Sequence, residues 1–316
     1  MRFQILVALV ASLPLCCAAS EQEPPHSPLP DNLSIPWQTR AGRDASVGSD
    51  AGALPDAPSI ELRPLESCGD SSAGFEGWIE AFRRHAVGQQ IQPSIVIAAL
   101  ATVRYDDEVV ALDRSQAAHK LSFEEFYKRH VSRDRLVRGK EQRRERADLL
   151  AKLDERYGVA PEVLVAIWGL ETDYGRNVGT RSSLNALATL AYDCRRAERF
   201  RGELMSALRI LQRGDLEVHD MVGAWAGELG QTQFLPSSYE RFAIDFDGDG
   251  RANLVGSASD ALASTANYLQ QHGWRPKEGY GPGTHNFGVL SEWNSSGVYR
   301  QTIAKFAAQI GKGKSQ

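Results

Sequence analysis

Signatures of several common enzyme classes are missing from this chain of 316 residues. It has no Walker phosphate loop, no dinucleotide-binding glycine pattern, no His-Glu-x-x-His helix and no Gly-x-Ser-x-Gly elbow. The seven histidines are scattered, and none has a close partner at metal-ligand spacing. Nucleotide, zinc and serine-hydrolase chemistry are therefore poorly supported. The formal net charge of -4 gives no reason to expect a nucleic-acid partner.

Long apolar runs are also missing. No segment approaches the roughly eighteen uninterrupted apolar residues that a membrane-spanning helix needs. The apolar run at residues 3–15 follows Arg2 and precedes small residues at 17–19, which is typical of a secretory signal. Residues 1–19 are therefore predicted to be a signal peptide, and the mature protein is expected to be periplasmic. Lipid attachment at Cys16 or Cys17 is the less favoured alternative.

Cysteine is scarce, with four residues in the whole chain. Two of them lie in the predicted signal peptide, which leaves Cys68 and Cys194 in the exported protein. An oxidising compartment favours a disulfide between them. Two separate buried thiols are the alternative.

The composition changes near residue 68. Residues 20–67 are rich in Pro, Ser, Asp and Gly and lack a sustained apolar pattern, so we predict a flexible tether. Residues 68–316 carry repeated helical stripes of apolar residues and few alternating strand patterns. Ser237 and Ser257 each precede an acidic residue by three positions, as in a capping box, which predicts two further helix starts. One mainly α domain with minor β structure is the expected fold class.

One carboxylate lies where a helix should carry hydrocarbon. Val163, Ile167 and Glu171 recur every fourth position and share one helical face. Pro161 suits the first turn of this helix and Gly175 its stop. Lost hydration and the helix C-terminus would both raise the pKa of Glu171 and keep it protonated, as a general acid requires. A solvated residue at the rim of the helix is the alternative.

Amide and aromatic side chains suggest a sugar-binding cleft. Gln231 and Gln233 occupy a segment punctuated by glycines, where the backbone can approach a ligand closely. Trp225, Tyr268 and Trp293 can stack on pyranose rings. Core packing is the alternative for each of these aromatic residues.

Seven short motifs occur in one order along the chain. They are E-T-D-Y-G at 171–175, A-L-A-T-L at 186–190, G-E-L-G-Q-T-Q-F-L-P-S-S-Y at 227–239, D-F-D-G-D-G at 245–250, A-N-Y at 266–268, H-G-W at 272–274 and W-N-S at 293–295. From about residue 68 onward the sequence resembles the lytic murein transglycosylases of the membrane-bound B type, glycoside hydrolase family 103. The resemblance implies a lysozyme-like catalytic lobe with additional helical elements and a catalytic core at about residues 150–274.

The resemblance also implies a reaction. Enzymes of this family cleave the β-1,4 bond between N-acetylmuramic acid (MurNAc) and N-acetylglucosamine (GlcNAc) in peptidoglycan. Glu171 would protonate the glycosidic oxygen and then deprotonate the C6 hydroxyl, which leaves a 1,6-anhydromuramyl end. Most glycosidases need two carboxylates, whereas an intramolecular nucleophile lets one carboxyl serve both steps. No cofactor is required for this chemistry.

Four positions match residues that line the cleft and hold sugar or acetamido groups in the family: Gln233, Tyr268, Trp293 and Asn294. Two positions depart from the family pattern. Ala224 stands where relatives commonly have serine, so one hydrogen bond of the cleft is in doubt. Glu228 replaces a small residue, and we expect it to face solvent. If Glu228 instead faced the cleft, its charge would raise the pKa of Glu171, or it would supply a second carboxylate and favour hydrolysis.

The acidic loop at residues 245–250 resembles the first half of a calcium-binding EF-hand. Asp245, Asp247 and Asp249 alternate, and the carbonyl of Arg251 is the expected next ligand. The glutamate expected at the twelfth position is missing, but Asp260 can close the site. Such a calcium ion would be structural. A turn that binds no metal is the alternative.

The resemblance makes peptidoglycan glycan strands the expected partner, and other cell-wall enzymes are expected as further partners. The protein itself is expected to be a monomer. A hydrolytic muramidase and a non-catalytic peptidoglycan-binding protein are the alternatives. The presence of Glu171 argues against the second.

Overall fold

Helices make up nearly all of the regular structure. The computed structural model describes residues 65, 67–115 and 121–312 of the chain, so the predicted signal peptide and most of the predicted tether lie outside it. The first half contains α1 (Phe75–Gly88), α2 (Pro93–Leu100), α3 (Asp107–Ser115), α4 (Phe123–His130), α5 (Arg133–Glu145), α6 (Ala147–Tyr157) and α7 (Pro161–Thr172). The second half contains β1 (Arg181–Ser182), α8 (Ser183–Tyr192), α9 (Ala197–Arg213), the 3-10 turn η2 (Val218–Asp220), β2 (Val222–Gly223), α10 (Pro236–Phe242), α11 (Ala258–Gln271), α12 (His285–Trp293) and α13 (Gly297–Gly311).

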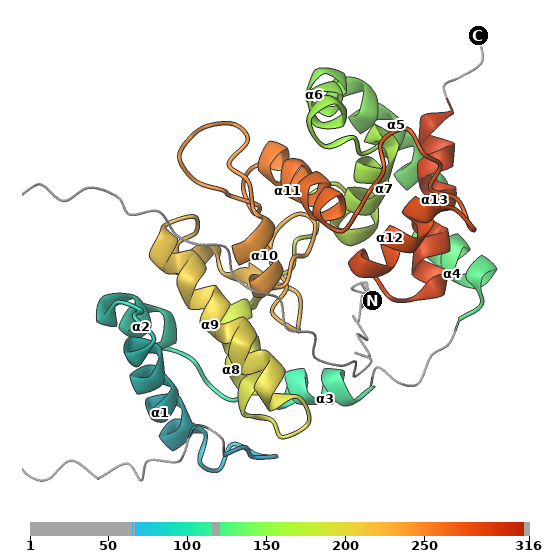
Figure 1. Ribbon diagram of the computed structural model, residues 1–316. Coiled ribbons are helices and arrows are strands. Elements are labelled where there is room, and N and C mark those ends of the chain that lie inside the picture. Colours follow the sequence, from blue (N-terminus) through green and yellow to red (C-terminus); the bar gives the residue numbers. More distant parts are fainter. Residues whose placement is uncertain (1–64, 66, 116–120, 313–316) are drawn as a thin grey trace, which may run out of the picture. The chain divides into compact units, whose positions relative to one another are not determined.

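Helix α7 is enclosed along almost its whole length. Its buried residues are Val163, Leu164, Val165, Ala166, Ile167, Trp168, Gly169, Leu170 and Thr172. A helix that is apolar on all sides needs neighbours on all sides. Helices α5, α6, α11 and α13 supply them, and α13 lies beside α7 in Figure 1. The last turn of α7, which carries Glu171, is therefore fixed by the core.

The ends of α7 follow from its sequence in part. Pro161 occupies the first turn, where its missing N–H costs nothing. The helix stops at Thr172, three residues before the predicted Gly175, because the next two residues are left-handed. The φ angle is 53° at Asp173 and 65° at Tyr174.

A second group of helices contains α1, α2, α8, α9 and α10, in which α9 packs against α8 and α10. A cluster of aromatic rings, including Phe75, Trp78 and Tyr192, joins α1 to α8. A disulfide links Cys68 and Cys194, as the cysteine count predicted, and ties the segment before α1 to the turn between α8 and α9. The indole of Trp78 donates to the carbonyl oxygen of Leu65 at 3.1 Å, so domain contacts include a residue before the predicted boundary at 68.

The only named sheet in the described residues has two short antiparallel strands. Arg181 pairs with Gly223 and Ser182 with Val222. The pairing holds the loop after α7 against the segment at 222–234, which carries the glutamines. A methyl group on Gly179 would approach the carbonyl oxygen of Gly223 to 2.0 Å, so this contact requires glycine.

Two predicted helix starts have different outcomes. The hydroxyl of Ser257 accepts the N–H of Asp260, so Ser257 caps α11 as predicted. Ser237 instead lies inside α10, where its N–H and hydroxyl donate to Glu203 at 2.9 Å each. The interpretation of Ser237 as a cap was therefore wrong. Within the described ranges, no helix is both long and apolar enough to cross a bilayer.

Candidate active site

Glu171 lies one residue before the end of α7, with one side of its carboxyl group enclosed. Its Oε1 accepts hydrogen bonds from the hydroxyl of Tyr299 at 2.6 Å and from Nε1 of Trp293 at 3.2 Å. Burial raises the pKa of Glu171 to about 7, although both hydrogen bonds favour the charged form. The negative charge of Glu228 raises this pKa further. A carboxyl group with this pKa can donate and accept a proton near neutral pH.

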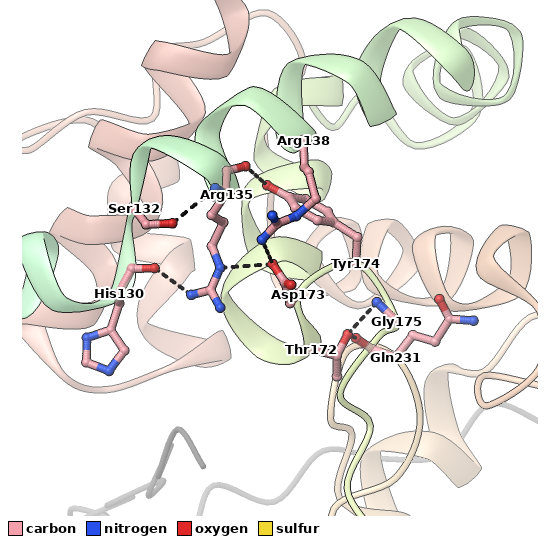
Figure 2. A network of polar contacts seen from close by, with 9 residues as sticks. All are labelled: His130, Ser132, Arg135, Arg138, Thr172, Asp173, Tyr174, Gly175 and Gln231. Atoms are coloured by element: carbon pink, nitrogen blue, oxygen red, sulfur yellow. Dashed lines mark hydrogen bonds and ion pairs between the residues drawn. The ribbon is translucent and has the colours of Figure 1, made fainter. Parts of the chain in front are cut away.

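After Thr172 the chain leaves α7 through a corner of two left-handed residues, Asp173 and Tyr174, which Figure 2 labels. Each left-handed residue other than glycine costs roughly 1–2 kcal/mol, so the corner needs support. Oδ1 of Asp173 accepts hydrogen bonds from Nε of Arg135 at 3.2 Å and from Nη2 of Arg138 at 2.7 Å. Both arginines belong to α5. Thr172 adds a hydrogen bond from its hydroxyl to the carbonyl oxygen of Gln231 at 2.5 Å.

Tyr174 fixes the same corner from the other side. Its hydroxyl donates to the carbonyl oxygen of Arg135 at 2.7 Å, as Figure 2 shows. A methyl group on Gly139 or Gly169 would come within 2.6 or 2.7 Å of this tyrosine side chain. Glycine at one position in α5 and one in α7 therefore makes room for Tyr174. The corner and the two helices form one rigid support for Glu171.

The segment at 222–234 faces Glu171 and is locked by its backbone. Gly227, Gly230 and Gln233 have positive φ angles of 86°, 78° and 56°. A methyl group on Gly230 would meet the carbonyl oxygen of Leu254 at 2.6 Å. Nε2 of Gln233 donates to the carbonyl oxygens of Val178 and Gly230, at 3.1 and 2.8 Å. No described residue donates to Oε1 of Gln233, so that oxygen is available to a ligand.

Two cavities meet at Glu171. Glu171, Ala224, Trp225 and Gln233 line both of them. The smaller cavity, of about 70 Å³, extends toward α10, α11 and α12. The larger, of about 940 Å³, extends along α5 and the loop after α7. An extended ligand can therefore pass Glu171 and occupy both sides.

Aromatic side chains form one wall of the smaller cavity. Tyr268, Phe234 and Trp293 line it and contact one another edge to face, with ring centroids 5.3 to 5.8 Å apart. The Tyr268 hydroxyl donates to the carbonyl oxygen of Glu292 at 2.7 Å, which fixes the ring. The structure thus brings Gln233, Tyr268 and Trp293, predicted from separate motifs, into one cavity with Glu171.

Two predicted ligand contacts lie elsewhere. Gln231 is buried, and its side chain accepts from Nε1 of Trp168 at 3.0 Å and donates to the carbonyl oxygen of Val255 at 3.2 Å. Asn294 is buried at the end of α12, and its Oδ1 accepts the N–H of Ser296 at 2.9 Å. Neither residue lines the two cavities beside Glu171. Both side chains support neighbouring segments in this structure, and their roles as substrate ligands stay predictions.

Two further residues bear on the site. Glu228, expected to face solvent, is half-buried and lines the smaller cavity with Glu171. Burial raises the pKa of Glu228 to about 7. The hydrogen bond from the N–H of Ala226 at 3.1 Å and the positive charges of Arg196 and Arg199 lower it, but by less than burial raises it. Tyr299 was not identified from the sequence as part of the site. It lies in α13, and no local motif signals that its hydroxyl reaches Glu171.

The acidic loop brings its three alternating aspartates together. Ligand oxygens of Asp245, Asp247 and Asp249 lie within 4.8 Å of one another, and all three residues are exposed. This oxygen-rich arrangement fits a hard cation such as calcium. Asp260 is fully buried, and its carboxylate accepts the N–H groups of Phe246, Asp247 and Asn253. It holds the base of the loop, and its role as a ligand stays a prediction.

Comparisons with known proteins point to one family. Residues 74–284 match the transglycosylase SLT domain family. Over 128 residues, 40% of this chain, the sequence is 44% identical to membrane-bound lytic murein transglycosylase B of Escherichia coli strain K12. The aligned region spans 35% of that relative's length.

Two solved structures extend the comparison. SltB3 from Pseudomonas aeruginosa, in complex with NAG-anhNAM-pentapeptide, matches with a TM-score of 0.73 and 31% identity, over 78% of this chain and 80% of that one. The Escherichia coli lytic transglycosylase Slt35 in complex with calcium matches with a TM-score of 0.66 and 25% identity, over 78% and 96%. These matches confirm the predicted mainly helical, lysozyme-like fold. Because the family match runs through most of the chain and includes Glu171, the chain belongs to the transglycosylase SLT domain family.

Proposed function

We propose that this protein is a peptidoglycan lytic transglycosylase, with Glu171 as general acid and then general base. The observation that carries the proposal is the pair of hydrogen bonds from Tyr299 and Trp293 to a carboxyl group whose pKa is about 7. Family membership and the cavities on both sides of Glu171 support a polymeric glycan as substrate.

In the first step the protonated Glu171 donates its proton to the glycosidic oxygen between MurNAc and GlcNAc. The bond from that oxygen to C1 breaks, the GlcNAc end leaves with a hydroxyl group, and positive charge develops at C1. Burial keeps the acid protonated before this step. The aromatic wall of Tyr268, Phe234 and Trp293 gives a sugar ring an apolar face to pack against.

In the second step Glu171 is a carboxylate and removes the proton from the C6 hydroxyl of the same MurNAc. The C6 oxygen forms a bond to C1, which closes the 1,6-anhydro ring and returns the proton to Glu171. Tyr299 and Trp293 stabilise the carboxylate between the two steps, because both donate to Oε1. Glu171 thus acts as proton donor in the first step and as proton acceptor in the second.

Glu228 gives a specific reason to keep hydrolysis as a second candidate function. It supplies another carboxyl group to the smaller cavity, and its pKa is also about 7. A muramidase would use such a group to activate water at C1. The two outcomes differ in product: hydrolysis leaves a reducing MurNAc end, whereas the transglycosylase product is lighter by one water molecule.

Zymography on peptidoglycan gels, combined with mass spectrometry of the released fragments, tests the proposal. The wild-type protein should clear the gel and release anhydro products, and Glu171→Gln should reduce the rate by at least about 100-fold. Glu198→Gln, an exposed residue of α9, is the matched control and should behave as wild type. Equal clearing by wild type and Glu171→Gln would exclude Glu171 from the mechanism. Reducing ends in place of anhydro ends would favour the muramidase.

The remaining parts of the proposal are the location and the metal. The predicted signal peptide at residues 1–19 supports export to the periplasm, where peptidoglycan lies. The cluster of Asp245, Asp247 and Asp249, with the carbonyl of Arg251, supports a structural calcium site. A solved relative in complex with calcium adds to that support.

A further inference from the structure

Three arginines line the larger cavity beside Glu171, and the proposed proton transfers use none of them. They are Arg135 and Arg138 of α5 and Arg176 of the loop after α7. The carboxylates among the lining residues are Asp173 and Glu171. With Glu171 protonated, three guanidinium charges face the single charge of Asp173, an excess of two positive charges. Such a cavity attracts an anionic group.

Two of the guanidinium groups are held in place before any ligand arrives. The carboxylate of Asp173 accepts hydrogen bonds from Nε of Arg135 at 3.2 Å and from Nη2 of Arg138 at 2.7 Å. Arg135 also donates to the carbonyl oxygen of His130 (Figure 2). The side chains of Arg135 and Arg138 keep 14% and 30% of their surface exposed. Fixed donors lose little conformational entropy when a ligand binds.

Arg176 differs from these two arginines. It is exposed, and it has no ion pair with any residue in the described part of the chain. It therefore contributes a whole guanidinium charge to the cavity. The other polar lining residues, among them Thr172, Asn177 and Thr180, are neutral.

We propose that this cavity binds carboxylate groups attached to the glycan strand, with Arg176 as the main specificity-determining residue. The inference rests on the proposed function, because it places the scissile sugar at Glu171 and the substituent in the adjoining cavity. Hydroxyl and acetamido groups are neutral and do not need the two excess charges. The planar guanidinium fork matches a carboxylate, with two parallel hydrogen bonds.

Peptidoglycan offers carboxylates from two sources of the same chemistry. The lactyl group of MurNAc carries one when the peptide has been removed. The peptide stem carries others on its side chains and at its terminus. The cavity of about 940 Å³ has room for a substituent that the cavity of about 70 Å³ lacks.

Calorimetric binding to the full-length Glu171→Gln protein tests the inference without turnover. Three soluble probes are compared: a β-1,4-linked GlcNAc tetramer, a GlcNAc–MurNAc tetrasaccharide with free lactyl groups, and the same tetrasaccharide with peptide stems. Adding Arg176→Gln should weaken binding of at least one carboxylate-bearing probe by about 3- to 10-fold, and binding of the GlcNAc tetramer by less than about 2-fold. The difference should shrink as salt is added. Arg144→Gln, an exposed arginine of α5 outside the cavity, is the control.

The outcomes separate the inference from the proposed function. Loss confined to the peptide-bearing probe identifies the stem as the source, and loss with the free lactyl probe identifies the lactyl group. An equal effect of Arg176→Gln on all three probes, or no effect on any, would overturn the carboxylate site while leaving the proposed function intact. Failure of the Glu171→Gln protein to bind every probe would overturn both.

Discussion

The hydroxyl of Tyr299 donates to Oε1 of Glu171 at 2.6 Å, across 128 positions of sequence. A hydrogen bond to a carboxylate stabilises the charged form and lowers the pKa. Tyr299→Phe should therefore raise the pKa of Glu171 and slow the first step, in which Glu171 gives up its proton and becomes a carboxylate. We expect the rate to fall about tenfold or more and the alkaline limb of the pH–rate profile to move to higher pH.

Tyr280→Phe provides a matched control for this variant. Its hydroxyl also donates to a glutamate, Glu162, at 3.1 Å, but outside the two cavities beside Glu171. A profile of Tyr299→Phe that overlays that of Tyr280→Phe would show that the hydrogen bond to Glu171 has no role in the reaction.

Glu228 should shift the same profile in the opposite direction. Its charge raises the pKa of Glu171, so Glu228→Gln should lower that pKa. Because the first step needs protonated Glu171, activity should then decline at a lower pH, with the alkaline limb displaced by about half a unit. Rates measured across pH, together with the ratio of anhydro to reducing products, check this. An unchanged profile with unchanged products would remove Glu228 from the mechanism.

Calcium should stabilise the acidic loop without entering the chemistry. Three exposed carboxylates within 4.8 Å repel one another, and a divalent cation relieves that repulsion. Added calcium should raise the melting temperature, a chelator should reverse the gain, and Asp247→Asn should abolish the dependence. Asp154→Asn, an exposed residue of α6, should retain the calcium response. A melting temperature that changes neither with added calcium nor with chelator would argue against the site.

The disulfide should contribute substantially to stability. It joins residues 126 positions apart, and closing so long a loop restricts the unfolded chain. Replacing Cys68 and Cys194 by serine should lower the free energy of unfolding by about 2–5 kcal/mol. Urea titration of oxidised wild type, reduced wild type and the double variant measures the difference. Three coincident transitions would contradict it.

Features that depend on local sequence were predictable. The helix around Glu171 follows from apolar spacing and Pro161, and the cap at Ser257 lies within a few residues of the N–H that it accepts. The acidic triad needs only alternate positions in one loop. The disulfide follows from the cysteine count, since Cys68 and Cys194 are the only cysteines outside the predicted signal peptide.

Features that depend on tertiary packing were not predictable. A motif shows that two glutamines lie in one segment but not which of them turns toward the core. Gln231 turns inward to Trp168, while the left-handed backbone at Gln233 directs its amide to the cavities. Glu228 was misplaced for the same reason. Tyr299 has no local signal at all, because α13 reaches Glu171 only through its packing on α7.

The two donors to Glu171 have a consequence for which part of the chain a complete site requires. Trp293 and Tyr299 both follow residue 284, where the family match stops. A fragment trimmed to that match keeps the acid but lacks both groups that stabilise its ionised form. Because Trp293 ends α12 and Tyr299 lies in α13, Glu171 has both hydrogen-bond donors only when α13 is packed against α7 and α12 against α13. Residues 74–284 alone therefore do not contain the complete hydrogen-bonding environment of Glu171.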